Sequence, residues 1–424
     1  MISSNRLEER INKLSKISEN IEGWDGVTRR ALSEEDRQAQ LLVKSWMEQA
    51  GMAVHLDPAG NLIGRKEGLD SNAKPVVIGS HIDSVENGGK FDGIIGVLGG
   101  VEIVQHIAEE NIQQVRPIEV IAFCEEEGSR FRDGGTYGSR AMTGKIRPEH
   151  LEATDPNGVT RREALKQFGL NPNEIFTKAV RKKGDMELYL EMHIEQGPFL
   201  EENGIPVGIL NGITGRYFGG MTIQGESNHV GATPMNMRHD ALLGASEIAL
   251  ALEEIVLSYG APAVGTVSTM KVFPGGVNII PDRVEMSGID IRDLSEDRRE
   301  GIVQAMQAKA EEVAEKRKLS VHFDDKLRMS SAFCSEHIMN AIKAEADEMN
   351  LPYLEMASGA CHDAQFLAEL CDMGMIFVRS QGGSHNPEER ASIEDITKGT
   401  ELLSRVAIHY LTQDELAVEQ AKIL

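Results

Sequence analysis

Apolar side chains recur at helical spacing in two segments near the beginning of the chain. They are Ile11, Leu14, Ile17 and Ile21 in the first segment and Leu41, Leu42, Trp46 and Met47 in the second. A spacing of three to four residues places such side chains on one face of a helix, where they can pack against a core. The pattern therefore predicts amphipathic helices over residues 2–21 and 34–50.

Short apolar runs between polar segments predict buried strands in the same half of the chain. These strands cover residues 54–56, 62–65, 75–83, 117–124 and 186–192. A glycine-containing apolar helix, predicted over residues 93–110, separates the third strand from the fourth. Strand, crossover helix and strand are typical of an α/β domain with a mainly parallel central sheet flanked by helices, which is the fold class we expect.

The order of elements changes in the middle of the chain. A strand, a helix, two strands, a helix and a strand are predicted over residues 218–224, 237–258, 264–272, 283–291, 296–318 and 320–325. This βαββαβ order is that of a ferredoxin-like α+β domain. The α/β pattern then returns, with predicted elements at residues 336–349, 375–378 and 394–411. We therefore predict that residues 212–328 form a domain inserted into a discontinuous domain of residues 1–211 and 329–424.

Composition agrees with a two-domain globular protein. The chain has 424 residues, of which 41% are hydrophobic, and this is enough for more than one core. The four cysteines lack the CxxC spacing of a zinc ribbon and argue against a disulfide framework. No segment has the length and apolarity of a membrane span, and residues 1–9 lack the layout of a signal peptide, so we expect a cytoplasmic protein.

The charge balance narrows the range of partners. Acidic residues outnumber basic ones by 67 to 44, which gives a net charge of -23. This excess disfavours nucleic acid and anionic membranes as partners, because both are negatively charged. A small anionic substrate is still compatible with the chain if local arginines receive it.

Five residues with metal-ligating side chains lie at the ends of predicted strands or in the loops that follow: His81, Asp92, Glu127, His193 and His385. In open α/β sheets, residues remote in sequence converge where strand ends meet loops. Nitrogen and oxygen ligands without a thiolate suit zinc, manganese, cobalt or nickel. If Asp92 bridges, one ion would take His81, Asp92 and His193. The other would take Asp92, Glu127 and His385.

Each of these residues also has a simpler interpretation. A single histidine at a strand end is more often an ordinary polar residue than a ligand. Asp92 beside Gly93 is also what a turn requires, and residues 125–127 are also what a solvated strand end would contain. The coincidence of all five favours the metal site over any one of these readings.

Seven motifs carry a resemblance to a known family. They are GSHIDSVENGGKFDG (79–93), EEGSRF (126–131), HIEQGPFLE (193–201), NHVGATPMNMRHDA (228–241), PGGVNIIPDRVEMSGIDIRD (274–293), SGACHDA (358–364) and FVRSQGGSHNPEE (377–389). With them the chain resembles the zinc peptidase-like superfamily of metal-dependent aminoacylases and carboxypeptidase G. Within it, the chain is most similar to the branch of N-carbamoyl-L-amino-acid hydrolases, allantoate amidohydrolases and β-ureidopropionases.

The resemblance implies a role for each matching residue. The metal ligands are the same five residues, with Asp92 as the bridge, and Asp83 orients His81. Glu126 is implied to be the general base and His229 the donor to the oxyanion. The residues implied to bind substrate are Gln196, Arg216, Asn278, Arg292, Ser358, Gly359 and Ala360.

Without the resemblance, residue chemistry supports some of these roles less well than others. An arginine fork matches a carboxylate, but Arg292 by itself is more simply a surface cation at a strand end, and His229 by itself is a loop histidine. Because positions 125–127 are three consecutive glutamates, the choice of general base depends on how the family motif is aligned with them. We align the motif on Gly128, which makes Glu126 the base and Glu127 a metal ligand. Cys361 stands where the family usually has a smaller residue, which leaves the size of the substrate pocket open.

The resemblance further implies two divalent metal ions per subunit and a homodimer formed through residues 212–328, which would close over the metal site. The leading substrate is an N-carbamoyl-L-amino acid, a small ureide with a carboxylate. Allantoate is the alternative, followed by N-carbamoyl-β-alanine and N-acyl amino acids. A non-catalytic metal-binding protein is disfavoured because Glu126 accompanies the ligands. The native metal, the natural substrate and the open or closed state of the inserted domain are not determined by the residues.

Overall fold

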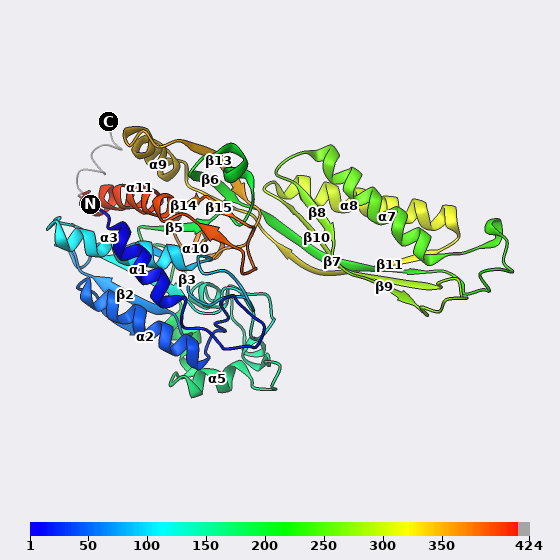
Figure 1. Ribbon diagram of the computed structural model, residues 1–424, viewed down its shortest axis with the longest axis horizontal. Helices are drawn as coiled ribbons and strands as arrows, with labels where there is room; N and C mark the ends of the chain where they lie inside the picture. Colours follow the sequence, from blue (N-terminus) through cyan, green and yellow to red (C-terminus); the bar gives the residue numbers. More distant parts are fainter. Residues whose placement is uncertain (414–424) are drawn as a thin grey trace. The chain divides into compact units, whose positions relative to one another are not determined.

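The computed structural model describes residues 1–413, which form two compact units (Figure 1). Unit 1 comprises Met1–Asn211, Phe333–Met356 and the described residues from His362 onwards. Unit 2 comprises Gly212–Ala332 and the short segment Ala357–Cys361. Compared with the division predicted from the sequence, unit 2 also contains residues 329–332 and 357–361.

Within residues 1–413, nine strands form the sheet of unit 1, in the order β1-β2-β4-β3-β5-β14-β6-β12, with β13 paired to β6. The four central strands, β4, β3, β5 and β14, are parallel, and the strands next to them are antiparallel. The strands are β1 (Ala53–Leu56), β2 (Leu62–Lys66), β3 (Val76–His81), β4 (Ile118–Phe123), β5 (Leu188–Ile194), β6 (Val207–Ile213), β12 (Ala332–Phe333), β13 (Tyr353–Ser358) and β14 (Asp372–Val378). This architecture confirms the predicted α/β class with a mainly parallel centre.

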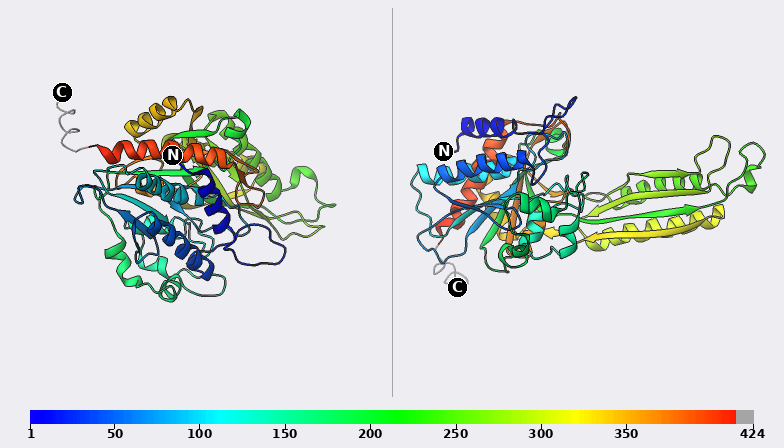
Figure 2. Two further views of the ribbon diagram at one scale, coloured as in Figure 1. Left: turned by 60° about the vertical axis from the view of Figure 1, so that its left-hand side comes forward. Right: turned by 90° about the horizontal axis from the view of Figure 1, so that it is seen from below.

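Helices enclose the central strands, which explains why β3, β4 and β5 are buried along their whole length. Side chains of one sheet face, including Val76, Ile78 and Val120, share a hydrophobic cluster with five helices. These are α1 (Ser4–Leu14), α2 (Glu34–Gln49), α3 (Ile94–Glu109), α9 (Glu336–Glu348) and α11 (Ile393–Thr412). Figure 2 shows α1 (blue) beside α11 (red). The short helices α4 (Tyr137–Met142) and α10 (Ala364–Leu367) contact β4 and β5.

The first predicted helix is wrong beyond Leu14. The fully buried guanidinium of Arg29 donates from Nη1 to the carbonyl oxygens of Leu14 and Ile17, at 3.0 and 2.7 Å. The last carbonyl groups of a helix have no partner within the helix, so a buried donor can receive them. The apolar spacing at Ile17 and Ile21 therefore continues after the helix has ended.

Unit 2 contains an antiparallel sheet in the order β11-β7-β10-β8, with β9 also paired to β10. Its elements are β7 (Gly215–Gln224), α7 (Ala241–Tyr259), β8 (Val264–Val267), β9 (Met270–Phe273), β10 (Arg283–Asp293), α8 (Glu296–Arg317) and β11 (Ser320–Met329). Helices α7 and α8 share a hydrophobic cluster with Tyr217, Ile289 and Ile291 of the sheet. Successive side chains of a strand point to opposite faces, so the residues between these lie on the other face.

The predicted single strand over residues 264–272 is two strands in the structure. Its break falls at Ser268 and Thr269, opposite a bulge at Gly288 in β10, whose φ is +102°. Ser268 donates its backbone N–H to the carbonyl oxygen of Gly288 at 3.0 Å, so the pairing continues around the bulge. Bulges of this kind leave little trace in the apolar pattern.

Two exclusions from the sequence can be compared with the structure. The cysteines at positions 124, 334, 361 and 371 are free thiols, as predicted. Among the helices of residues 1–413, none combines the length and apolarity that crossing a membrane requires.

Candidate metal centre

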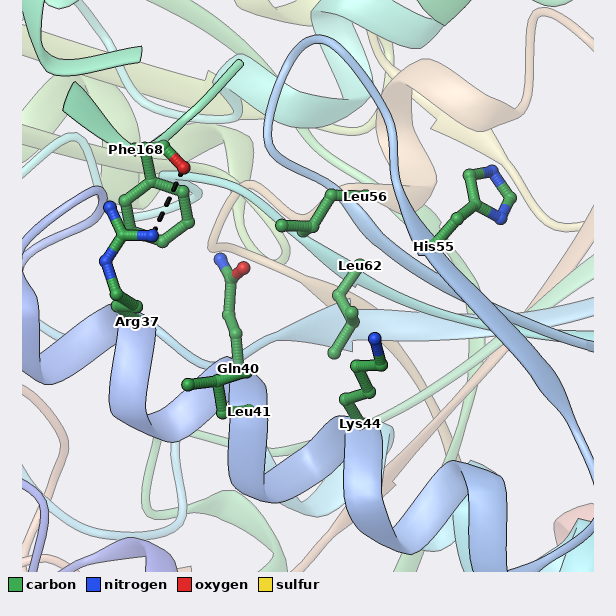
Figure 3. Close-up of a pocket in the computed structure, with 8 residues that line it drawn as sticks. All are labelled: Arg37, Gln40, Leu41, Lys44, His55, Leu56, Leu62 and Phe168. Atoms are coloured by element: carbon green, nitrogen blue, oxygen red, sulfur yellow. Dashed lines mark hydrogen bonds between the residues drawn. The ribbon is translucent and has the colours of Figure 1, made fainter. Parts of the chain in front are cut away.

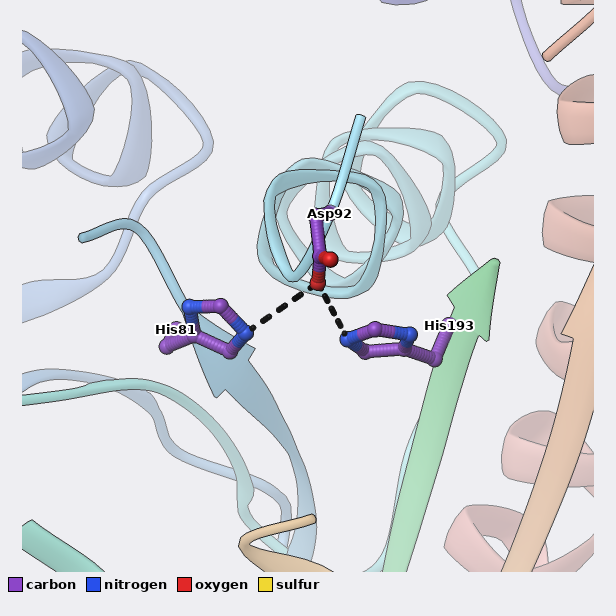
Figure 4. Close-up of side chains that lie close together, drawn as sticks. All are labelled: His81, Asp92 and His193. Carbon is purple, nitrogen blue, oxygen red and sulfur yellow. Dashed lines mark ion pairs between the residues drawn. The ribbon is translucent and has the colours of Figure 1, made fainter. Parts of the chain in front are cut away.

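His81, Asp92 and His193 converge at the ends of the parallel strands of unit 1. The Nε2 atoms of His193 and His81 lie 3.1 and 3.6 Å from the same oxygen, Oδ1 of Asp92 (Figure 4). All three side chains are buried, and their ligand atoms lie within 4.8 Å of one another. His81 ends β3, His193 lies in β5, and Asp92 precedes α3, so the parallel pairing of the strands brings the three together.

The second oxygen of Asp92 faces another cluster. The Nε2 atom of His385 lies 3.7 Å from Asp92 Oδ2 and 3.4 Å from Glu127 Oε2. Glu127 is nearly buried, whereas the His385 side chain is 52% exposed. Asp92 therefore presents one oxygen to each cluster, as a bridging carboxylate would, and the second cluster is more open to solvent.

The hydrogen bonds of the two buried imidazoles define their tautomers. Nδ1 of His81 lies 3.0 Å from the carbonyl oxygen of Asp83, and Nδ1 of His193 lies 2.9 Å from that of Ile194. A carbonyl oxygen only accepts, so both Nδ1 atoms carry a proton, and in the neutral form of each ring Nε2 directs a lone pair at Asp92. Lone pairs facing a carboxylate oxygen are the donor set of a metal ion.

Buried oxygen atoms without a hydrogen-bond partner test whether these residues fit a metal ion. Among the described residues, Asp92 Oδ1 and Glu127 Oε1 are buried and have no hydrogen-bond partner. A buried carboxylate oxygen without a partner is costly, and a cation would remove that cost. Burial also raises the pKa of Glu127 well above its usual range, and the nearby Asp92 carboxylate adds to this effect. The residues present fit two divalent cations.

The side chains of the three consecutive glutamates lie in three different places. Glu125, at φ +55°, turns into the protein and accepts from Arg161 Nε at 3.1 Å. Glu126 Oε2 lies 3.7 Å from Nε2 of His81, outside both clusters, and Glu127 is part of the second cluster. Burial raises the pKa of Glu126, against the opposing effect of His81. The structure thus places Glu125 in the interior, Glu126 beside His81 and Glu127 in the second cluster.

Asp83 contacts His81 differently from the way the resemblance implied. Its carboxylate Oδ1 is 3.7 Å from His81 Nδ1, farther than its own carbonyl oxygen at 3.0 Å. The carboxylate instead accepts the backbone N–H groups of Glu126 and Glu127, each at 3.2 Å. Asp83 therefore orients the imidazole through its backbone and the glutamate loop through its side chain.

Sequence reasoning missed Ser384 and Glu389, which flank His385 in its motif. Ser384 Oγ lies 2.6 Å from Asp92 Oδ2 and 2.8 Å from Glu389 Oε2. Glu389 Oε1 accepts the backbone N–H of Asp92 at 3.3 Å. Gln196, predicted as a substrate contact, donates from Nε2 to Asp92 Oδ2 at 2.9 Å in this structure.

Gly93 allows the close approach of Asp92 and His81. Its φ is +69°, and a Cβ atom here would lie 2.4 Å from Nε2 of His81. Any other residue would strain the backbone and displace the imidazole.

The remaining predicted residues lie in unit 2. Arg216 and Arg292 share the carboxylate of Asp290, and Arg292 Nη1 donates to the carbonyl oxygen of Gly359 at 2.6 Å. Gly359 belongs to a tight turn in which Ser358 Oγ accepts from the backbone N–H of Ala360. The turn thus joins the arginine group.

His229 and Asn278 form a second group on exposed loops of unit 2. Nδ1 of His229 accepts the backbone N–H groups of Gly231 and Ala232 at 3.1 and 3.2 Å, so Nε2 carries the proton of the neutral ring. Val230 donates its backbone N–H to the carbonyl oxygen of Asn278. An exposed Nε2–H is able to donate to a ligand.

Cys361 follows the Ser358–Ala360 turn and lies against Met329, with the two sulfur atoms 3.9 Å apart. Burial raises the pKa of its thiol, against the opposing effect of Arg292. The side chain is therefore a neutral, polarizable filler beside the turn.

A pocket of about 170 Å³ lies elsewhere in unit 1 (Figure 3). Its walls include Leu41, Leu56, Leu62 and Phe168. The guanidinium of Arg37 lies over the Phe168 ring and donates to the carbonyl oxygens of Gln167 and Phe168. No predicted site residue lines this pocket, so it is separate from the metal centre.

Comparisons with known proteins agree with this geometry. The model of peptidase family M20/M25/M40 matches residues 77–409. An N-carbamoyl-L-amino-acid amidohydrolase of Pseudomonas sp. (strain NS671) is 47% identical, over 97% of this chain and 99% of the relative. One of Geobacillus stearothermophilus is 45% identical, over 95% and 97%. The crystal structure of an amidase of the hydantoinase/carbamoylase family from Burkholderia multivorans superposes with a TM-score of 0.89 at 32% identity, covering 97% of this chain and 98% of that one.

Substitution of Arg161 tests the contribution of its ion pair with Glu125 to the stability of the glutamate loop. Its fully buried guanidinium pairs with Glu125, whose pKa burial raises to about 7, and with Asp133. Arg161→Met would leave the Glu125 carboxylate buried without its partner, and we expect it to lower the free energy of unfolding by about 3–5 kcal/mol in urea titrations. Arg162→Met, which breaks only an exposed pair with Glu152, should cost less than about 1 kcal/mol. Equal effects of the two changes would contradict this account.

Metal titration tests the two clusters separately. After removal of metal with a chelator, calorimetric titration with Mn²⁺ should show two equivalents bound. His385→Ala leaves the His81, Asp92 and His193 cluster complete, so we expect one equivalent to bind as before and the other at least roughly tenfold more weakly. His55→Ala, an exposed histidine outside both clusters, is the control and should bind as the unaltered protein does. Two unchanged equivalents in His385→Ala would exclude the second site.

Proposed function

Because the chain belongs to peptidase family M20/M25/M40, we propose that it is a metal-dependent amidohydrolase acting on N-carbamoyl-L-amino acids. It hydrolyses the ureido C–N bond, and one water converts the substrate into the amino acid, carbon dioxide and ammonia. The observation that carries this proposal is the pair of clusters sharing Asp92, with Glu126 next to them but in neither. Both relatives at 45–47% identity bear the name of this activity.

The ureido carbon is a poor electrophile, and its hydrolysis needs help with both charge and protons. Two divalent cations, zinc, manganese, cobalt or nickel, would polarise the carbonyl group and activate water. We assign their ligation to His81, Asp92 and His193 on one side and to Asp92, Glu127 and His385 on the other. We assign to Glu126 the transfer of a proton from the attacking water to the leaving nitrogen. Its nearly buried carboxylate, which belongs to neither cluster, is suited to this role.

We assign substrate recognition to the groups of unit 2. The Nε2–H of His229 is a suitable donor to the oxyanion that forms when water adds to the carbonyl. The guanidinium of Arg292 and the amide of Asn278 are suitable partners of the substrate carboxylate. Gln196 and the Ser358–Ala360 turn complete the proposed contacts.

Allantoate is the second candidate substrate. It also combines a ureido group with a carboxylate, and the assigned residues would serve it in the same way. The two relatives reported above favour the N-carbamoyl amino acid.

We further propose that the protein is a homodimer formed through unit 2. Leu243, Leu250 and Leu257 are 42%, 64% and 72% exposed, and a spacing of seven residues aligns them along α7. Val264 of β8, an edge strand of the sheet that contacts α7, is also exposed. A stripe of exposed leucines of this kind is typical of a protein–protein interface.

Glu126→Gln tests the proposed base. It preserves the shape of the side chain but cannot accept the proton, so we expect kcat in an ammonia-release assay to fall roughly 10²–10⁴-fold with metal content unchanged. Glu149→Gln, at an exposed glutamate of the short helix Pro148–Glu152, should retain full activity.

The same assay distinguishes the substrates. A panel of N-carbamoyl-L-amino acids, N-carbamoyl-β-alanine, allantoate and N-acetyl amino acids should show the highest kcat/KM for the first group. Turnover of the acetyl compounds alone would overturn the ureide assignment.

Leu250→Glu tests the dimer. A charge in the centre of the leucine stripe should convert the dimer to a monomer in light scattering after size exclusion. Leu69→Glu, at a leucine of unit 1 that is 73% exposed, should leave the mass unchanged. A monomeric unaltered protein would refute the proposal.

A further inference from the structure

Two arginines face each other on the open side of the sheet of unit 2. Arg216 of β7 and Arg292 of β10 are direct partners in the antiparallel register. Both alternate with residues of the hydrophobic cluster, Tyr217 and Ile291, and so lie on the face opposite α7 and α8. Like charges in such a pair repel each other unless an opposite charge lies between them.

Asp290 supplies that charge. It precedes Arg292 by two residues and so lies on the same face of β10. Its Oδ1 accepts from Arg292 Nε at 2.9 Å and its Oδ2 from Arg292 Nη2 at 3.1 Å. Oδ2 also accepts from Arg216 Nε at 2.8 Å and lies 2.6 Å from Arg216 Nη2. Although burial opposes its ionisation, the two arginines lower the pKa of Asp290, so the group is an Arg⁺–Asp⁻–Arg⁺ triplet.

The triplet retains one positive charge. An arginine paired with one aspartate would be neutral and would attract a carboxylate weakly. Here Asp290 neutralises the charge of one arginine, and the second arginine leaves the group with one net positive charge. The side chains of Arg216, Asp290 and Arg292 are partly exposed, so a ligand can reach the group.

The contacts of Arg292 also limit its orientation. A guanidinium has five N–H groups. Arg292 uses two of them on Asp290 and one on the carbonyl oxygen of Gly359. The plane of the guanidinium is thus held from two sides, by the strand and by the Ser358–Ala360 turn, and two N–H groups are left for a ligand.

We propose that Asp290 is a positioning residue, which orients Arg292 to receive the substrate carboxylate, and that Arg216 restores the positive charge of the pair. This inference rests on the proposed function, because it takes the carboxylate of an N-carbamoyl amino acid as the ligand. Its consequence is selectivity for substrates with a carboxylate over otherwise identical neutral ones.

The test compares an N-carbamoyl-L-amino acid with its carboxamide, in which the carboxylate is a neutral amide. Asp290→Asn leaves both arginine charges in place, removes the negative charge between them and replaces one of the two acceptor oxygens that orient them with an NH₂ donor. If Asp290 positions Arg292, KM for the carboxylate should rise at least roughly tenfold, with kcat changed less than about threefold. KM for the carboxamide should not change. If only charge mattered, the additional positive charge would lower KM for the carboxylate.

Asp290→Glu provides a second variant that keeps the charge and displaces the oxygens by one methylene. It should also raise KM for the carboxylate alone, and it keeps the inference testable if Asp290→Asn does not fold. Asp324→Asn is the matched control, because Asp324 is an exposed aspartate of β11 in the same sheet. It should behave as the unaltered enzyme, and circular dichroism and metal content should be the same for all variants.

The outcomes separate this inference from the proposed function. An unaltered enzyme that hydrolyses no ureide of the panel would overturn both. An active enzyme in which the Asp290 variants leave KM for the carboxylate unchanged or lower would overturn only the inference. A loss of the same size for the carboxylate and the carboxamide would also overturn it, because the role of Asp290 would then be structural.

Discussion

The mutual repulsion of buried carboxylates is the constraint on which the organisation of unit 1 depends. Asp83, Asp92, Glu126 and Glu127 lie together at the ends of the parallel strands with little contact with water. Two imidazoles place Nε2 toward Asp92, while their Nδ1 atoms donate to backbone carbonyl oxygens. Such a group is stable only if protons or cations offset its charge, and oxygen and nitrogen donors in this number suit divalent cations. Cation binding at these clusters would therefore stabilise the folded state of this region.

The side chains of the two clusters are held in place by neighbours that belong to neither cluster. Asp83 holds the loop of Glu126 and Glu127 through two backbone N–H groups, while Arg161 holds the preceding Glu125. Ser384 and Glu389 connect the His385 loop to Asp92. These two loops are thus held by buried and partly buried hydrogen bonds, which is how a protein maintains the geometry of a metal site.

Unit 2 contains a different electrostatic feature, a group with one net positive charge in a chain that is strongly acidic overall. Strand alternation places Arg216, Asp290 and Arg292 on the face that the helices do not cover. The shared aspartate removes the repulsion between the two arginines and leaves one positive charge on a rigid strand pair. The excess of acidic residues elsewhere in the chain makes such a local positive group distinctive.

The sequence by itself determined the fold class and most of the helices and strands, because apolar periodicity is a local property of the chain. It also indicated the residue types at strand ends, since ligand chemistry is carried by the side chain. It did not determine the end of α1, where Arg29 takes the last carbonyl groups, or the break between β8 and β9, which depends on Gly288 in another strand. Strands β6 and β13 were also missed. Only the tertiary structure decided which oxygen of Asp92 faces which histidine and where each of the three glutamates points. It also decided that Ser384 and Glu389 hydrogen-bond to Asp92 and that Asp290 pairs with Arg216 and Arg292. These contacts join elements that the chain path brings together, and a local pattern contains no information about such distances.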